Sequence, residues 1–243
     1  MPNKPAKYCI KMYALVDSKS FYVLNLEVYV GLQPEGPFRL SNKPEDIVLR
    51  LVEPIRNSSR NVTFANWFSG YPLLGTIQAT VGTIRKNKKE IPPQLLACQN
   101  REAKSSQCAF QQDVTLISYI PKKGKNVLLI STLHHGKQWR CIWLTEISRT
   151  ATDGKDTDTS SDEVLKPEMI TFYNSTKDGV DIVDELSGSY IMFLGTVKNG
   201  HLLYFFLLLN SAGINAMVIY NANHPEANVK RIFFLETIRI ISD

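Results

Sequence analysis

Three aspartates stand where a carboxylate could serve phosphoryl-transfer chemistry. Asp17 follows an extended run of aromatic and β-branched residues, YCIKMYALV, and precedes the polar residues 18–20. In DGVDIVDEL a helix would place Asp181 and Asp184 on one face. Enzymes that cleave phosphodiesters use carboxylates from different elements to hold two divalent ions. Asp17 and Asp181 suit such a site, although an aspartate in a hairpin turn usually serves only the turn.

The stretch RNVTFANWFSGYP, residues 60–72, has the opposite character. Val62, Thr63 and Phe64 favour an extended strand, and Asn66 begins a turn toward a buried helix start. Many α/β folds display a working side chain directly after a strand of this kind. Here that position holds Ala65, so the displayed side chain is a bare methyl group.

The elements that would position these residues can be read from hydrophobic periodicity. Residues 8–16 and 21–30 predict a hairpin with Asp17 at its tip, and residues 47–55 predict a helix. A helix is expected to start near Thr176 with Ser175 as its cap, and Val180, Val183 and Leu186 form its apolar stripe. Further strands are predicted at 60–64, 79–87, 114–121, 126–135 and 141–147, with an apolar helix at 201–220 and an amphipathic segment at 229–242.

Composition is that of an ordinary globular protein. The 243 residues are 44% apolar and 21% charged, which is enough to build a sizeable core. The net charge of +5 is compatible with nucleic acid but does not establish it. The N-terminus lacks the apolar core of a signal peptide, so we expect a nuclear or cytoplasmic protein that is not secreted.

The cysteines and histidines give no metal signature. Cys9, Cys98, Cys108 and Cys141 are scattered without a CxxC pair, so we expect reduced thiols and no zinc cluster. The adjacent pair His134-His135 would point to opposite faces of a strand, which favours a structural role.

Residues 201–220, HLLYFFLLLNSAGINAMVIY, are about one bilayer span long. Asn210 and Asn215 lie inside this run, and unpaired amides are costly in hydrocarbon. We therefore expect a buried core helix and no membrane, and keep membrane association through 201–220 as an alternative.

Seven basic residues are candidates for contact with a DNA backbone. A solvated face explains each run equally well. They form two runs, Arg85, Lys86, Lys88 and Lys89, and then Lys122, Lys123 and Lys125 in the turn KKGK.

Several blocks of the sequence resemble piggyBac-type transposases, and they occur in the family's order along nearly the whole chain. They are AKYCIKMYALVDSKSFYVLNLEVYVG, RNVTFANWFSGYPL, VGTIRKNKKEIPPQLL, LISYIPKKGKNVLLISTLHH, KPEMITFYNSTKDGVDIVDELSGSY and LLNSAGINAMVIYN. The resemblance implies an α/β fold, a ribonuclease-H-like mixed sheet of five strands flanked by helices and interrupted by a β-rich insertion. It also implies cut-and-paste chemistry on DNA at TTAA sites, with three aspartates and two Mg²⁺ or Mn²⁺ ions.

The family's first aspartate falls on Asp17 and its third on Asp181, with Asp184 as the neighbouring acid. The second belongs directly before Asn-Trp-Phe, where this chain has Ala65. An arginine-rich stretch of the family is reduced here to Lys198 and His201, and a glycine is replaced by Asp178. The family's N-terminal DNA-binding region and its C-terminal zinc module are also expected to be absent.

The resemblance divides the chain into three segments. Residues 1–87 are the first part of the core, 88–165 are the insertion with a flexible acidic loop at 148–164, and 166–243 are the C-terminal core helices. We expect a transposable-element-derived protein that does not cleave DNA, retains weak DNA binding and leaves homodimer formation open. An active metal-dependent transposase or nuclease is the alternative, and a membrane-associated protein is a second one.

Overall fold

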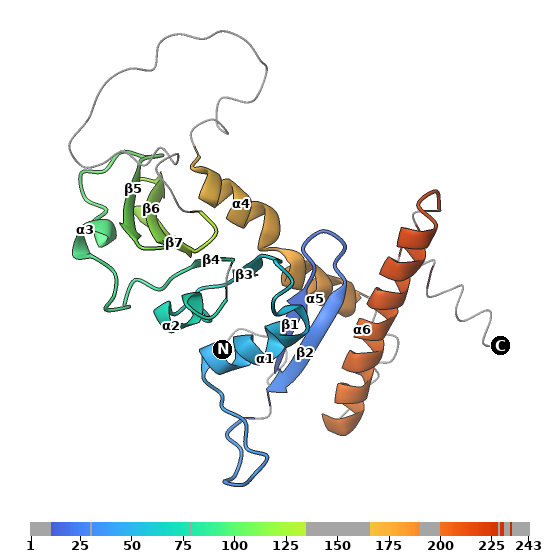
Figure 1. The fold of residues 1–243 in the computed structure, drawn as a ribbon. Coiled ribbons are helices and arrows are strands. Elements are labelled where there is room, and N and C mark those ends of the chain that lie inside the picture. The colour runs from blue at the N-terminus through green and yellow to red at the C-terminus, as the bar shows by residue number, and fades with distance from the viewer. Residues whose placement is uncertain are drawn as a thin grey trace, which may run out of the picture. The chain divides into compact units, whose positions relative to one another are not determined.

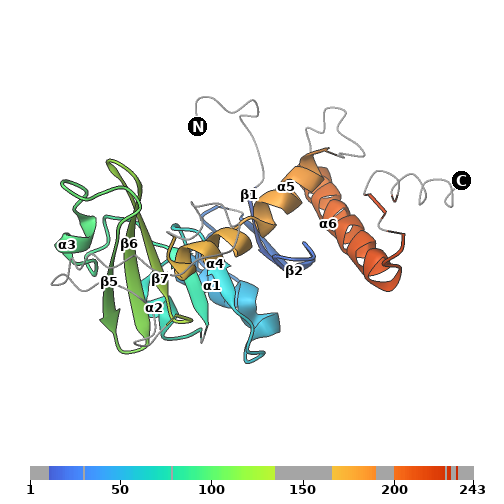
Figure 2. The same cartoon turned by 90° about the horizontal axis from the view of Figure 1, so that it is seen from above.

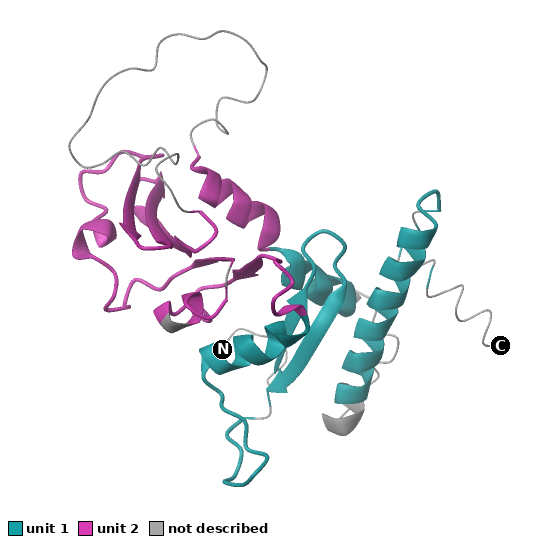
Figure 3. Cartoon of the chain, viewed as in Figure 1, with its two compact units in different colours: residues 1–54, 178–243 teal, residues 55–177 magenta. Residues whose placement is uncertain are grey.

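The computed structural model describes residues 11–29, 31–77, 79–134, 166–189, 200–227, 229–230 and 234. The chain divides into two compact units (Figure 3). Unit 1 combines Met1–Pro54 with Asp178–Asp243, and unit 2 is the continuous segment Ile55–Lys177. The strand predicted at 141–147 and the acidic loop predicted at 148–164 lie outside the described residues.

Unit 1 is built on a β-hairpin. The strands β1 (Lys11–Val16) and β2 (Val23–Tyr29) pair antiparallel, as their alternating aromatic and β-branched residues predict. The helix α1 (Pro44–Val52) begins with Pro44, carries two acids in its first turn and is followed by a single 3-10 turn, η1 (Glu53–Ile55). The buried stripe of α1 has helical spacing and consists of Ile47, Val48, Leu51 and Val52.

Two further helices complete unit 1, α5 (Gly179–Ser189) and α6 (Gly200–Asn223) (Figure 1). Val23, Val183 and Ile214 form a buried cluster that joins β2, α5 and α6. The side chain of Asn215 accepts a hydrogen bond from the backbone N–H of Val23 at 2.7 Å and donates one to the carbonyl of Val23 at 2.8 Å. Its amide group therefore fastens the middle of α6 to the start of β2.

An ion pair joins β2 to α1. The guanidinium of Arg50 binds both carboxylate oxygens of Glu27, at 2.6 and 2.8 Å. The hydrogen bond with Glu27 raises the pKa of Arg50, because it stabilises the charged guanidinium. Since the proton is held more tightly in the folded state, this contribution to stability is lost only above the ordinary pKa of arginine and is constant at neutral pH.

Unit 2 contains a mixed sheet of five strands in the order β3-β4-β7-β6-β5. The short strands β3 (Val62–Phe64) and β4 (Thr80–Thr83) are parallel, and the other neighbours are antiparallel. The remaining strands are β5 (Ser106–Gln111), β6 (Val114–Lys122) and β7 (Lys125–Ser131), and the helices are α2 (Tyr71–Leu74), α3 (Pro93–Leu96) and α4 (Glu168–Thr176).

The core of unit 2 lies between the sheet and α4 (Figure 2). Met169 and Ile170 from α4 pack against Val81, Ile117 and Leu129 of the sheet. The predicted fold class, an α/β arrangement with a mixed sheet flanked by helices, is confirmed. The predicted segments 1–87, 88–165 and 166–243 stay a prediction, and the strands β5 to β7 of the proposed insertion are continuous with β3 and β4 in one sheet.

Three local expectations were wrong. Thr176 ends a helix instead of starting one, and Ser175 lies inside α4, where its hydroxyl donates to the carbonyl of Phe172. Val180 is 46% exposed, because α5 begins at Gly179 and turns Val183 and Leu186 inward. Cys108 is disulfide-bonded, whereas Cys98 is a free thiol.

The apolar helix α6 is less buried than expected. Only 11% of its most apolar window, within Tyr204–Asn223, is buried, and by length and composition it could cross a membrane. Phe205, Leu209 and Ile219 are exposed, while Ser211 and Ile214 are buried. A core helix passes the same test of length and composition, so this feature alone does not assign a membrane.

Candidate functional site

Asp17 lies in the turn between β1 and β2 and is exposed. Its Oδ1 accepts hydrogen bonds from the backbone N–H groups of Lys19 at 3.1 Å and Ser20 at 2.7 Å, and from the hydroxyl of Ser20 at 2.8 Å. The carbonyl of Asp17 accepts from Phe21, which has a positive φ of 63°. One carboxylate oxygen of Asp17 is therefore committed to shaping the turn.

The start of α5 packs directly against this turn. A Cβ atom on Gly179 would lie 3.4 Å from Cα of Ser18 and 3.7 Å from the carbonyl oxygen of Asp17. Asp181 follows two residues later in the first turn of α5, and both Asp181 and Asp184 are exposed. Within unit 1 the structure thus brings together the two elements that carry the predicted acids, Asp17 and Asp181.

Ala65 lies in unit 2, directly after β3, and its side chain is exposed. Its carbonyl accepts a hydrogen bond from the N–H of Phe68 at 3.0 Å and another from the hydroxyl of Ser69 at 3.2 Å. The rings of Trp67 and Phe68 meet edge to face with centroids 4.8 Å apart. The turn is therefore closed by backbone and aromatic contacts, and it does not need an acid at position 65 to form.

Gly82 fixes the approach of β4 to β3. It lies opposite Phe64 in the parallel ladder, and a Cβ atom at this position would overlap the ring of Phe64. Only glycine leaves room for Phe64, the last residue of the strand that precedes Ala65. The sequence showed Gly82 as one residue of a predicted strand and gave no sign of this contact.

The donor set does not fit the two metal ions of the piggyBac resemblance. Two-metal sites need several carboxylates that share the ions. Within the part of the chain that the structure describes, no group of three His, Cys, Asp or Glu side chains is placed to hold one ion. Ala65 adds no donor to this set.

The two basic runs meet at one end of the sheet in unit 2. Because β4 and β7 are antiparallel, the end of β4 lies beside the start of β7, and the N–H of Ile84 donates to the carbonyl of Leu128. Arg85 and Lys86 therefore emerge next to the β6–β7 turn, where Gly124 has a φ of 76°. Lys88 is half-buried and the other six predicted contact residues are exposed, and none of the seven forms an ion pair with a described residue.

Arg101 is a nearby cation that sequence reasoning missed. Its guanidinium donates to the hydroxyl of Ser118 at 2.6 Å and to the carbonyl of Ser118 at 2.8 Å. Burial lowers the pKa of Arg101, because it disfavours the charged form. Ser118 continues the network to Asn126 and to the carbonyl of Leu95, so Arg101 is a structural residue.

His134 has the structural role that its place on a strand predicted. It is 4% exposed, its Nδ1 lies 2.8 Å from the hydroxyl of the buried Ser131, and its ring meets Phe172 edge to face. His135, Lys198 and the N-terminal residues 1–10 lie outside the described residues.

The fold and the paired acids in unit 1 define a class, the α/β catalytic domains of DNA transposases. The family model described as "Transposase IS4" matches residues 1–217, and this chain belongs to that transposase family. A cryo-EM structure of piggyBac transposase in a synaptic complex with hairpin DNA is similar over 98% of this chain, with 30% identity and a TM-score of 0.76. The chain spans 46% of the length of that protein.

Proposed function

We propose that this chain is a transposase-derived DNA-binding protein that does not cleave DNA. Ala65 is the observation that carries the first half of this proposal. The piggyBac pattern has an aspartate directly before Asn-Trp-Phe, and a methyl group can neither coordinate a metal ion nor offset its charge. Residues of a catalytic unit act together, so loss of one ligand should lower the cleavage rate by orders of magnitude.

The two remaining acids favour the same conclusion. Asp17 and Asp181 are exposed, and one oxygen of Asp17 serves its own turn. Mg²⁺ or Mn²⁺ held by Asp17, Asp181 and Asp184 would supply Lewis-acid chemistry in an active family member. In this chain we expect these acids to bind such ions weakly.

Calorimetry with Mn²⁺ on wild type and Ala65→Asp tests the loss of the metal site. We expect Ala65→Asp to bind Mn²⁺ more tightly because it supplies a third carboxylate, and Asn66→Asp, with the same charge one residue along, to resemble wild type. A cleavage assay on TTAA-flanked DNA with Mg²⁺ or Mn²⁺ should show no product for wild type. Cleavage by wild type, or equally tight Mn²⁺ binding in all three proteins, would establish the alternative of an active nuclease.

DNA binding is the second half of the proposal, and the basic end of unit 2 supports it. Seven cations converge there from the end of β4 and from the β6–β7 turn, and the similar piggyBac structure holds hairpin DNA. Contacts of this kind go to phosphates, so binding should be weak, independent of sequence and sensitive to salt.

A triple substitution tests this surface. Lys122→Ala, Lys123→Ala and Lys125→Ala together should weaken binding to duplex DNA and reduce the slope of log K against log salt by roughly 2 to 3. The matched control replaces the exposed lysines Lys19, Lys43 and Lys177, which changes the net charge equally away from this end of the sheet. Equal losses in the two triple variants would show a general charge effect and contradict a defined DNA surface.

Homodimer formation, nuclear localisation and the absence of a membrane association are part of the same proposal. Light scattering at several protein concentrations tests the dimer. Flotation with liposomes tests the membrane alternative for α6, and recovery of the protein with the vesicles would favour that alternative.

A further inference from the structure

A cavity of about 290 Å³ lies between the sheet of unit 2 and α4, entirely within residues 55–177. One wall comes from the sheet, with Tyr119 and Pro121 on β6 and Val127 and Leu129 on β7. Each pair is two residues apart, so all four side chains lie on one face of the sheet. The sheet therefore supplies an apolar wall with one aromatic ring.

The opposite wall comes from α4. Ile170, Tyr173 and Asn174 line the cavity, and their i, i+3, i+4 spacing places them on one face of the helix. The deep part of the cavity is rigid, since Tyr119, Leu129 and Ile170 are each no more than 6% exposed. The hydroxyl of Tyr173 lies 3.4 Å from Oγ1 of Thr83, which restrains the ring at the edge of the cavity.

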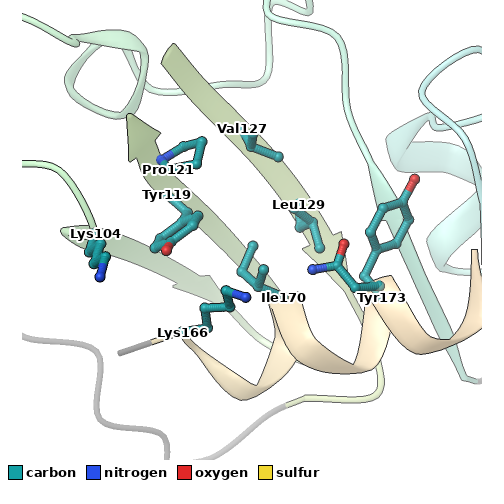
Figure 4. Close-up of a pocket in the computed structure, with 9 residues that line it drawn as sticks. Lys104, Tyr119, Pro121, Val127, Leu129, Lys166, Ile170 and Tyr173 are labelled. Atoms are coloured by element: carbon teal, nitrogen blue, oxygen red, sulfur yellow. The ribbon is translucent and has the colours of Figure 1, made fainter. Parts of the chain in front are cut away.

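Two exposed lysines, Lys104 and Lys166, complete the lining. Figure 4 shows both lysines on the same side of the cavity, beside Tyr119, with Tyr173 at the opposite end. Positive charge therefore gathers on one side, and apolar and aromatic surface fills the rest. A ligand that fits this distribution has a flat, largely apolar ring system at one end and an anionic group at the other.

We propose that this cavity binds a nucleoside phosphate, with its base between the apolar sheet wall and Tyr173 and its phosphate at Lys104 and Lys166. The volume lies at the lower limit for ligand pockets, which suits one mononucleotide and excludes a larger cofactor. Stacking of a base on an aromatic side chain contributes about 1–3 kcal/mol and tolerates any base. The amide of Asn174 adds donors and an acceptor for a base edge or a sugar hydroxyl.

This ligand has two sources, a free nucleotide or an unpaired nucleotide of a DNA strand, and the second source rests on the proposed DNA binding. An unpaired base can leave the helix and enter a pocket lined by aromatic and apolar side chains. A base within an intact duplex cannot. The cavity would thus add recognition of unpaired DNA to the backbone contacts of the basic end.

Calorimetry on the full chain with dAMP, deoxyadenosine and inorganic phosphate tests the proposal. We expect saturable binding of dAMP that is tighter than binding of either component. The double variant Lys104→Ala, Lys166→Ala should weaken dAMP binding about tenfold and leave deoxyadenosine unchanged, since hydrogen bonds to charged groups contribute on that scale. Tyr173→Leu should weaken both, and the control Lys122→Ala, Lys123→Ala should change neither.

Absence of saturable dAMP binding would overturn the proposal. So would inorganic phosphate that binds as tightly as dAMP, because two lysines alone would then explain the site. A duplex with a one-nucleotide bulge separates the sources. If the bulge binds more tightly than the paired duplex, and this gain is lost in Tyr173→Leu, then the ligand is a nucleotide of DNA. If the two duplexes bind alike, a retained dAMP affinity assigns the free nucleotide.

Failure of the proposed function gives a different result. A chain that binds dAMP but not paired duplex would retain the pocket and lose the DNA-binding surface. A chain that binds paired duplex but not dAMP would retain the surface and lose the pocket.

Discussion

At the scale of single residues, the position of an absent side chain matters at Gly82 as much as at Ala65. A Cβ atom at Gly82 would overlap the ring of Phe64, which is buried between β3 and its neighbours. We expect Gly82→Ala to lower the free energy of unfolding by about 1–3 kcal/mol, because the ring or the strand must move. Chemical denaturation measures the change.

The matched control for Gly82 is Gly36→Ala. A Cβ atom at Gly36 would meet nothing within 4 Å, and its φ does not favour glycine. The control should leave the unfolding midpoint unchanged. If both substitutions are equally harmless, the close packing of β3 on β4 is not a constraint on the strand that ends beside Ala65.

At the scale of elements, one amide explains why α6 belongs to unit 1 although much of it is exposed. Asn215 makes both of its hydrogen bonds with the backbone of Val23, and Ile214 beside it is fully buried. We expect Asn215→Ala to destabilise the protein by about 1–3 kcal/mol, since the N–H and the carbonyl of Val23 lose their side-chain partner. Hydrogen exchange at the Val23 amide should become faster before exchange elsewhere in β2.

Asn223→Ala is the control for Asn215. Asn223 is exposed and bonds only to the carbonyl of Ile219 within its own helix. Its removal should not alter exchange at Val23. Equal protection of the Val23 amide in wild type and Asn215→Ala would mean that α6 is not fastened to β2 in solution.

The comparison of sequence and structure also belongs to this scale. Strands and helices with clear periodicity, such as β1, β2 and α1, could be predicted because alternation and helical spacing reflect burial on one face. The pairing of β4 with β7, which brings the two basic runs together, could not be predicted, since it depends on contacts between residues far apart in the chain. Ser175 was mistaken for a cap because a serine suits both a helix start and a helix end, and only the packing of α4 and α5 separates the two.

The candidate site followed the same division. The motif before Asn66 showed that position 65 lacks a carboxylate, because a missing functional group is visible in the sequence. The contact of Gly179 with the Asp17 turn was not visible, since it depends on how α5 meets β1. The pocket beneath α4 also escaped sequence reasoning, because its lining comes from five separate stretches of the chain.

At the scale of the whole molecule, the two units differ in how the chain builds them. Unit 2 is one continuous segment, and its five strands, α4 and their shared core all lie within it. Unit 1 needs both ends of the chain, because the hairpin and α1 come from Met1–Pro54 while Val183 and Ile214 of its core come from Asp178–Asp243. We therefore expect residues 55–177, expressed alone, to unfold cooperatively and to protect the β6 and β7 amides as in the full chain.

The opposite fragment provides the control. Residues 1–54 alone lack every core residue supplied by α5 and α6, and an isolated two-stranded hairpin is at best marginally stable in water. This fragment should show no cooperative transition by circular dichroism or calorimetry. If 55–177 also fails to fold while the full chain folds, the two units stabilise each other. If 55–177 folds, it becomes the smallest piece of the chain in which the basic end and the pocket can be tested without the acids Asp17 and Asp181.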